Sequence, residues 1–192
     1  MRVLVACEFS GVVRRAFQER GHDAWSCDLL PCEGDPVWHI QGDAVEAAYN
    51  RPWDMMIAHP PCTHLAVSGA RWFKKKQREQ EEALEFVQRL LDAPIPKIAL
   101  ENPVGAISTR IRKPDQTIQP YQFGHMEQKK TCLWLKNLPK LVDTHNVYDA
   151  MMQLPKKERE RMHYLPPSPD RWKLRSKTFD GIAQAMAQQW SN

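Results

Sequence analysis

Short apolar runs and longer amphipathic stretches alternate along the chain. Runs bounded by turn-forming residues predict strands, and they lie at residues 2–7, 24–27, 38–41, 55–58, 98–100 and 130–135. Apolar residues at helical spacing predict helices between them, at residues 12–20, 44–49, 74–92 and 179–190. Strands that alternate with helices predict an α/β protein with parallel neighbouring strands.

Three segments do not fit this alternation. Residues 105–117 show no clear pattern, residues 148–163 have helical character with many charges, and the proline-rich residues 165–169 exclude regular structure. No internal repeat or flexible linker interrupts the chain. The 192 residues therefore predict one domain with one sizeable core.

The composition, with 42% hydrophobic and 26% charged residues, is that of a globular protein. No apolar run approaches the roughly 20 residues that cross a membrane, and the first strand begins too early for a signal peptide. The five cysteines show no spacing typical of a zinc site or a disulfide framework. We therefore expect a protein of the reducing cytoplasm.

The formal net charge of +4 is small, but the basic residues are clustered. One cluster covers residues 71–78 and another covers residues 171–177. Clusters of this kind suit contacts with phosphate groups. The alternative interpretation of each is a solvated helix face.

The central feature of the sequence is the apolar run at residues 55–58, which leads into His59, Pro60, Pro61 and Cys62. Two prolines fix the backbone as the chain leaves the strand. Cys62 is therefore expected at the carboxyl end of a sheet strand, where open α/β sheets build their ligand sites. It is a candidate nucleophile, and the alternative is a packed thiol beside a structural turn.

The first quarter of the chain has the pattern of a nucleoside-binding half-fold. A strand, a turn containing Gly11, a helix and a second strand lead to Asp28. An acid at this distance from the turn can accept both ribose hydroxyls, while the helix N–H groups favour an anion nearby. Asp28 could instead be a simple strand cap. Asp43 is expected to cap a helix, to accept from an adenine amine, or both.

A second ionisable residue is expected on the same rim as Cys62. The strand at residues 98–100 ends at Glu101 and Asn102, and parallel strands bring their carboxyl ends to one edge of a sheet. Glu101 could also be only a polar strand terminus. Each of His59, His64 and His125 is expected to be a surface or capping histidine.

The order of these pieces resembles the C5 cytosine-specific DNA methyltransferase family over nearly the whole chain. The resemblance implies a Rossmann-like S-adenosyl-L-methionine-dependent methyltransferase fold, a mostly parallel sheet with helices on both faces. It also implies S-adenosyl-L-methionine as the cofactor. The residues that would bind this cofactor are Glu8, Phe9, Ser10, Gly11, Asp28, Leu29, Asp43, Ala44, Pro60 and Thr178.

The same resemblance assigns catalytic roles. Cys62 of the Pro-Cys motif would attack C6 of cytosine, and Glu101 of the Glu-Asn motif would supply or share a proton at N3. Lys130 occupies the first arginine position of the family's Gln-x-Arg-x-Arg strand and would polarise O2. The residues expected to contact the substrate are Asn102, Arg71, Lys74, Arg171 and Arg175.

The chain departs from the family in several places. It has one glycine in the first motif, with Val13 where the second would fall, and Thr63 follows the Pro-Cys motif in place of glutamine. Residues 137–175 replace the family's target recognition domain, but this insert is too short to be a domain of its own. We therefore expect DNA as the partner, single-stranded or read with low specificity, or the help of a second subunit in a homodimer. Small size suggests a phage-type variant, in the cytoplasm of a bacterium or a phage-infected host.

Other functions remain open at this point. The same pocket could modify RNA or a free pyrimidine nucleotide. A catalytically degenerate methyltransferase fold could bind nucleic acid or a protein, or the covalent adduct could take a group other than methyl.

Overall fold

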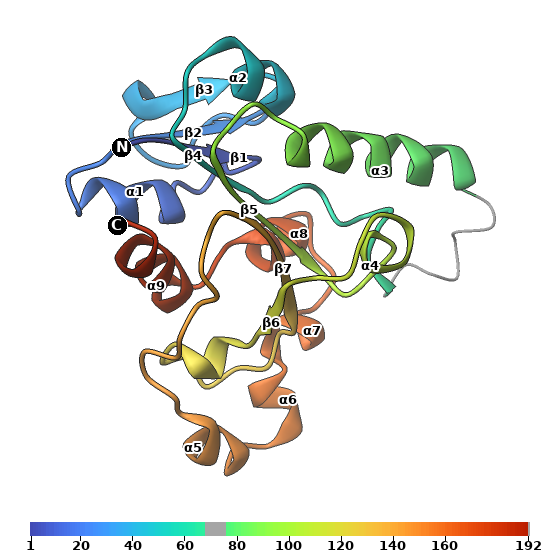
Figure 1. Ribbon diagram of the computed structural model, residues 1–192. Helices are drawn as coiled ribbons and strands as arrows, with labels where there is room; N and C mark the ends of the chain where they lie inside the picture. The colour runs from blue at the N-terminus through green and yellow to red at the C-terminus, as the bar shows by residue number, and fades with distance from the viewer. Residues whose placement is uncertain (68–75, 192) are drawn as a thin grey trace.

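The computed structural model describes residues 1–67 and 76–191, so the predicted contacts Arg71 and Lys74 lie outside the described residues. Within these ranges the chain forms one sheet in the order β3-β2-β1-β4-β5-β7-β6 (Figure 1). Its strands are β1 (Arg2–Ala6), β2 (Asp23–Asp28), β3 (His39–Gln41), β4 (Met55–Ala58), β5 (Lys97–Pro103), β6 (Gln116–Ile118) and β7 (Thr131–Lys136).

Only β7 runs against its neighbours in this sheet. The strands β1 to β5 pair in parallel, whereas β7 is antiparallel to both β5 and β6. This order with one reversed strand is that of the Rossmann-like methyltransferase fold. The predicted fold class is therefore confirmed.

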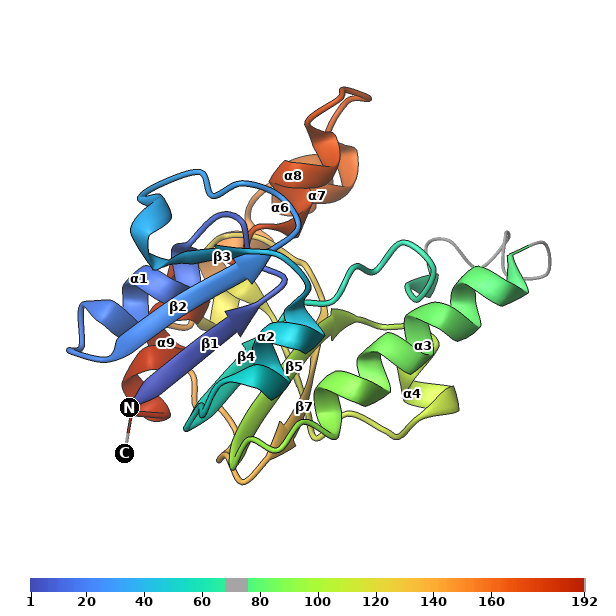
Figure 2. The ribbon, with the colours of Figure 1, turned by 90° about the horizontal axis from the view of Figure 1, so that it is seen from above.

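Helices cover both faces of the sheet (Figure 2). On one face lie α1 (Val12–Gln18) and α9 (Asp180–Gln189). Phe17 of α1 and Met186 of α9 are buried there in one cluster with Ile57 of β4. On the other lie α2 (Ala44–Asn50) and α3 (Gln77–Leu91), which bury Leu84 with Met56. Because successive strand residues point to opposite faces, each face has its own apolar layer.

The remaining helices in the described part of the chain are short. They are η1 (Pro36–Trp38), α4 (Ile107–Arg110), η3 (Pro120–Gln122), α5 (Tyr148–Met152), α6 (Lys156–Arg159), α7 (Arg161–Tyr164) and α8 (Arg171–Ser176). The segment 148–163, expected to be helical, is divided into α5, α6 and α7. Pro155 explains the first break, since proline cannot continue a helix from within.

Two strands differ from the expectation. Trp38 ends a 3-10 helix instead of beginning a strand, and β5 continues through Glu101 and Asn102 to Pro103. The segment 105–117, which showed no pattern, contributes α4 and leads into the edge strand β6. Among the described residues, no helix is long and apolar enough to cross a membrane.

Candidate active site

The carboxyl ends of the parallel strands surround two cavities within the described residues. We call the first, of about 380 Å³, the Asp28–Asp43 cavity. The second, of about 340 Å³, is the Cys62 cavity. Pro61 contributes to the wall of both, so the turn after β4 separates them.

Two carboxylates present acceptors at the first cavity. Asp28 accepts the Leu30 backbone N–H through Oδ1 at 2.9 Å. Asp43 caps α2, because its Oδ1 accepts from the N–H groups of Val45 and Glu46 at 2.7 and 3.0 Å. The capping role predicted for Asp43 is confirmed. Within the described residues, neither Oδ2 atom accepts a hydrogen bond, so both can accept from a ligand.

The rest of this cavity is lined by residues of five segments. The predicted cofactor contacts Leu29 and Ala44 line it, and so do Cys7, Gly42, Pro61, His64, Glu79, Glu82, Ala83 and Phe86. Phe86 belongs to the apolar stripe that predicts the helix over residues 74–92. It is half-buried, because the stripe of an amphipathic helix continues beyond the core to the cavity edge.

The turn after β1 lies elsewhere, although all four of its residues were expected to hold the cofactor. Glu8 is buried and accepts from Val13 N–H at 2.7 Å and Arg14 N–H at 3.3 Å. This carboxylate occupies the anion-binding end of α1 from within the chain. Burial raises the pKa of Glu8, although the charge of His59 and these two N–H groups act against the rise.

The other three residues of that turn have structural contacts. The Phe9 ring is buried against Trp172, with 5.8 Å between ring centroids, and the Ser10 hydroxyl approaches Glu8. Gly11 is the N-cap of α1 with φ of +68°, a conformation that favours glycine. None of them lines the Asp28–Asp43 cavity.

The Cys62 cavity brings together residues that are far apart in sequence. It is lined by His59, Pro60, Pro61, Cys62, Thr63, Glu101, Asn102, Pro103, Lys129, Trp172, Arg175 and Ser176. The expected nucleophile and the expected acid therefore lie in one cavity. Pro60, expected at the cofactor, lines this cavity instead.

Asn102 fixes the turn that carries Cys62. Its Nδ2 donates to the Pro60 carbonyl at 2.8 Å, and the residue is 1% exposed. Residues after Cys62 are fixed as well, since Leu65 N–H and Ala66 N–H donate to the Cys62 carbonyl at 3.0 and 2.9 Å. The nucleophile thus stands on a backbone held from both sides.

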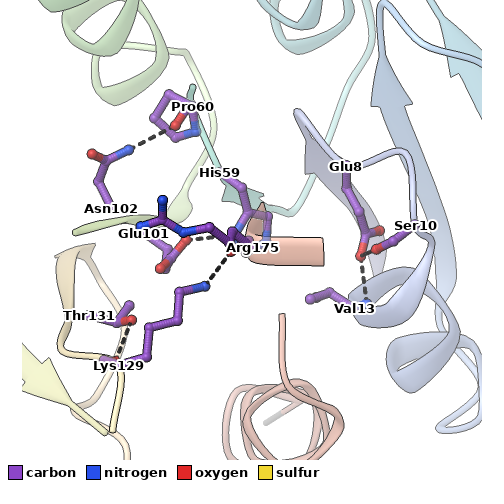
Figure 3. A network of polar contacts seen from close by, with 10 residues as sticks. All are labelled: Glu8, Ser10, Val13, His59, Pro60, Glu101, Asn102, Lys129, Thr131 and Arg175. Atoms are coloured by element: carbon purple, nitrogen blue, oxygen red, sulfur yellow. Dashed lines mark hydrogen bonds and ion pairs between the residues drawn. The ribbon is translucent and has the colours of Figure 1, made fainter. Parts of the chain in front are cut away.

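His59 holds Glu101, as Figure 3 shows. Nδ1 of His59 lies 3.2 Å from Oε2 of Glu101, and the His59 side chain is 8% exposed. Its Nε2 is buried without a hydrogen-bond partner among the described residues. The expectation of a surface or capping histidine at His59 is therefore wrong: β4 ends here beside β5, and the ring points onto the next strand.

The surroundings of Glu101 favour its ionised form. Burial is the largest single influence and would raise the pKa of this carboxyl, but the hydrogen bond and charge of His59 act against it. The ammonium of Lys129 and a hydrogen bond with Thr131 act in the same direction. The pKa of Glu101 is lowered as a result.

The pKa of the Cys62 thiol shifts in the opposite direction, upward. Cys62 is exposed at the mouth of the cavity, but the surrounding cavity walls desolvate its thiol and raise its pKa, and the negative charge of Glu101 raises it further. Lys129 and Arg175 oppose this rise by their positive charges. At rest, the single proton of the pair is on sulfur and the carboxyl is ionised.

Of the two neighbouring lysines, Lys129 faces the Cys62 cavity and Lys130 does not. Lys129 lines the cavity and donates from Nζ to the Arg175 carbonyl at 2.7 Å, whereas Lys130 is exposed. Alternate residues entering β7 point to opposite faces, so Lys129 and Thr131 share the face of Glu101. The expectation that Lys130 lies beside Glu101 is therefore wrong by one residue.

The two arginines expected at the substrate have different positions. Arg175 lines the Cys62 cavity. Arg171 instead donates from Nε to the Leu165 carbonyl at 2.8 Å and from Nη2 to the His163 carbonyl at 3.0 Å, so it holds the insert together. Trp172, beside it, lines the cavity and was missed, because a lone aromatic between basic residues gives no periodic signal.

Thr178 and His125 lie around the start of α9. Thr178, expected at the cofactor, borders a small space behind Glu101 and Lys129 and does not line the Asp28–Asp43 cavity. His125 accepts the Gly181 N–H through Nε2 at 2.9 Å. This is the capping role expected of that histidine.

Comparisons with known proteins find matches among solved structures, at low sequence identity. No family model and no curated protein matches the chain. A solved structure described as a DNA modification methyltransferase encoded within a prophage of E. coli is 16% identical, with a TM-score of 0.49, over 81% of this chain and 56% of that one. An rRNA methylase from Escherichia coli is 15% identical, with a TM-score of 0.43, over 70% of this chain and 55% of that one. The chain spans just over half the length of each.

Proposed function

We propose that this chain transfers a methyl group from S-adenosyl-L-methionine to C5 of cytosine in DNA, through a covalent adduct with Cys62. The observation that carries the proposal is the shared cavity of Cys62 and Glu101, with a second, nucleoside-sized cavity on the other side of Pro61. Acid and nucleophile on one rim are what addition to a pyrimidine ring needs.

The residues of the Asp28–Asp43 cavity fit an adenosine. A ribose offers two hydroxyl donors that Asp28 can accept, and an adenine amine suits the free oxygen of Asp43. Phe86 and Ala83 supply an apolar wall for the base. When bound, S-adenosyl-L-methionine supplies an electrophilic methyl group.

The residues of the Cys62 cavity activate the pyrimidine. Sγ of Cys62 adds to C6. The electron pair of the C5–C6 double bond moves to form a C4–C5 double bond, the C4–N3 pair moves to N3, and N3 takes a proton. C5 of the resulting enamine is then a nucleophile. After C5 has been methylated, a solvent water takes the C5 proton and the S–C6 bond breaks, which restores the C5–C6 double bond and the Cys62 thiolate. N3 then returns its proton to Glu101, so neutral 5-methylcytosine is released.

The proton balance follows from the directions of the two pKa shifts. At rest Cys62 is a thiol and Glu101 a carboxylate. Moving the thiol proton to Glu101 gives a thiolate and a carboxylic acid with no change in total charge. The thiolate then attacks C6 while Glu101 gives that proton to N3, so the pair supplies the proton that the addition consumes.

Lys129 is the cation available to O2 of the ring, in place of Lys130. It would leave the Arg175 carbonyl or share its three N–H donors between this carbonyl and O2. An ammonium is a less directional partner than a guanidinium.

The test is methyl transfer from labelled S-adenosyl-L-methionine to DNA, followed by digestion to nucleosides and mass analysis. Label in 5-methylcytosine is expected with the wild type and is expected to vanish in Cys62→Ala. Cys32→Ala is the matched control, because this free cysteine lies outside both cavities. Transfer that persists in Cys62→Ala would exclude the covalent route.

A further inference from the structure

The helix α8 forms one wall of the Cys62 cavity and presents an indole to it. Trp172 and Arg175 both line the cavity that holds Cys62 and Glu101. Trp172 is 50% exposed, which is unusual for a tryptophan. An exposed aromatic face beside a nucleophile is a surface on which a flat ring can stack.

The indole is held in place from behind. The Phe9 ring lies 5.8 Å from it at an interplanar angle of 58°. The helix itself is tied to the cavity by Lys129 Nζ, which donates to the Arg175 carbonyl, and to the insert by Arg171. Trp172 is thus a fixed wall, and stacking on it would cost little ordering of the protein.

The charges around this wall suit a phosphate backbone. Arg175 lines the cavity and makes no side-chain hydrogen bond or ion pair within the described residues. Lys173 lies 5.7 Å from the Trp172 ring centroid, and its ion pair with Asp170 is exposed at 3.7 Å, where it is weak. A base stacked on Trp172 would therefore have cations close to its phosphates.

We propose that the Cys62 cavity takes an unpaired pyrimidine nucleotide of a single strand, with its base stacked on Trp172 and its phosphate at Arg175. This inference rests on the proposed function and names its substrate class. DNA and RNA single strands share the chemistry, so both are arms of the test.

A comparison of the free energy of base stacking with the cost of extruding a base favours a strand that is already unpaired. Stacking of one base on an aromatic side chain contributes about 1–3 kcal/mol. Extruding a base from a duplex costs a few kcal/mol, which is of the same size. Within the described residues, the insert brings one short basic helix to the cavity.

The experiment measures binding apart from catalysis. The full chain, without cofactor, is titrated into fluorescently labelled oligonucleotides, and anisotropy gives the Kd. The probes are a single-stranded DNA with one cytosine, its duplex and the RNA of the same sequence. We expect the single strands to bind at least tenfold more tightly than the duplex.

The variants test the indole itself. Trp172→Ala should weaken single-strand binding by about 5- to 150-fold, the equivalent of one stacked base, and Trp172→Phe should retain most of it. Leu174→Ala is the control, since Leu174 is an exposed neighbour on α8 that does not line the cavity. Thermal melting checks that each variant is folded.

The outcomes separate this inference from the proposed function. A duplex bound as tightly as the single strand, or an unchanged Kd in folded Trp172→Ala, overturns the inference. Tighter binding of RNA than of DNA supports the unpaired base and identifies RNA as its source. Absence of 5-methylcytosine in the transfer assay overturns the proposed function and leaves the binding result unaffected.

Discussion

Asn102 Nδ2 donates to the Pro60 carbonyl oxygen at 2.8 Å, from a side chain that solvent hardly reaches. The bond joins β5 to the turn that precedes Cys62. Glu101 and Asn102 are neighbours in one strand, so their side chains point in opposite directions. One acts at the cavity and the other holds the backbone that carries the nucleophile.

Asn102→Ala should lower both stability and catalysis. It leaves a buried carbonyl without its donor, which costs about 1–3 kcal/mol, or a fall in Tm of roughly 2–4 °C per kcal/mol at this chain length. Because the turn is released, methyl transfer per folded molecule should fall about 10-fold or more. Differential scanning calorimetry and the transfer assay measure the two effects.

Gln116→Ala is the matched control for that variant. The Gln116 amide exchanges two hydrogen bonds with the Leu141 backbone, at 2.7 and 2.8 Å, away from the cavity. Gln116→Ala should lose about as much stability as Asn102→Ala and keep the wild-type rate of methyl transfer. An equal loss of rate in both variants would show that Asn102 acts through stability alone.

Gly105→Ala should disturb the segment that follows Cys62. A Cβ at Gly105 would lie 1.9 Å from the Leu65 carbonyl oxygen, so the backbone must shift. Crowding of this kind costs about 1–3 kcal/mol. We expect a lower Tm and slower transfer, whereas Gly34→Ala, whose Cβ would meet its nearest atom at 3.6 Å, should change neither. An unchanged transfer rate in Gly105→Ala would mean that this segment does not position Cys62.

Asp43→Asn should weaken cofactor binding without loosening α2. Asparagine caps a helix as well as aspartate does, but its amide nitrogen cannot accept from an adenine amine. Isothermal titration with S-adenosylhomocysteine should show binding about tenfold weaker, the size expected for one hydrogen bond to a charged group. Asp35→Asn, a cap at Val37 N–H outside both cavities, is the control. Equal affinity in Asp43→Asn and wild type would remove Asp43 from the cofactor site.

Glu101→Gln should alter the dependence of stability on pH. The pKa of Glu101 is lower in the folded chain than its ordinary value, so its stabilising contribution is present above about pH 4.3 and is lost as the pH falls through the folded pKa. The glutamine variant should therefore show a shallower loss of stability in this acid range. Urea unfolding at a series of pH values measures the slope, and identical slopes would mean that Glu101 has no such shift.

His59→Leu should move the pH profile of catalysis. Removing the ring removes the hydrogen bond and the charge that lower the pKa of Glu101, so that pKa should rise. The proposed addition starts from ionised Glu101 and the Cys62 thiol, so protonation of Glu101 stops it at low pH. This acid limb of the kcat/KM profile should therefore move to a higher pH in the variant. His163→Leu, a change at an exposed histidine of α7, should leave the profile in place. A fall in activity with no displacement of the profile would reduce His59 to a packing role.

The strands and the residues at their ends could be predicted from the sequence. Cys62, Glu101 and Asp43 follow apolar runs closely, and parallel pairing leaves little freedom in where such residues meet. The cavity that joins Cys62 to Glu101 is therefore a consequence of topology, which the alternation of strands and helices already contains.

Side-chain direction and distant partners could not be predicted in this way. Choosing Lys130 over Lys129 required knowing which residue begins β7, and a shift of one residue reverses the face. His59 gives no pattern because its partner is 42 positions away. Trp172 lies on a helix too short for any periodicity, and its place at the cavity depends on contacts with Lys129 and Phe9.

Pro61 borders both cavities, and a pyrrolidine ring with a fixed φ and no N–H is a poor hinge. A partition of this kind acts as a spacer of set thickness between two bound molecules. The distance between the two bound molecules is then fixed by the folded structure and does not depend on a conformational change at each turnover. A substitution that makes this turn flexible would let the separation of the two bound molecules vary during the reaction. A misplacement of about 1 Å can cost two orders of magnitude in rate.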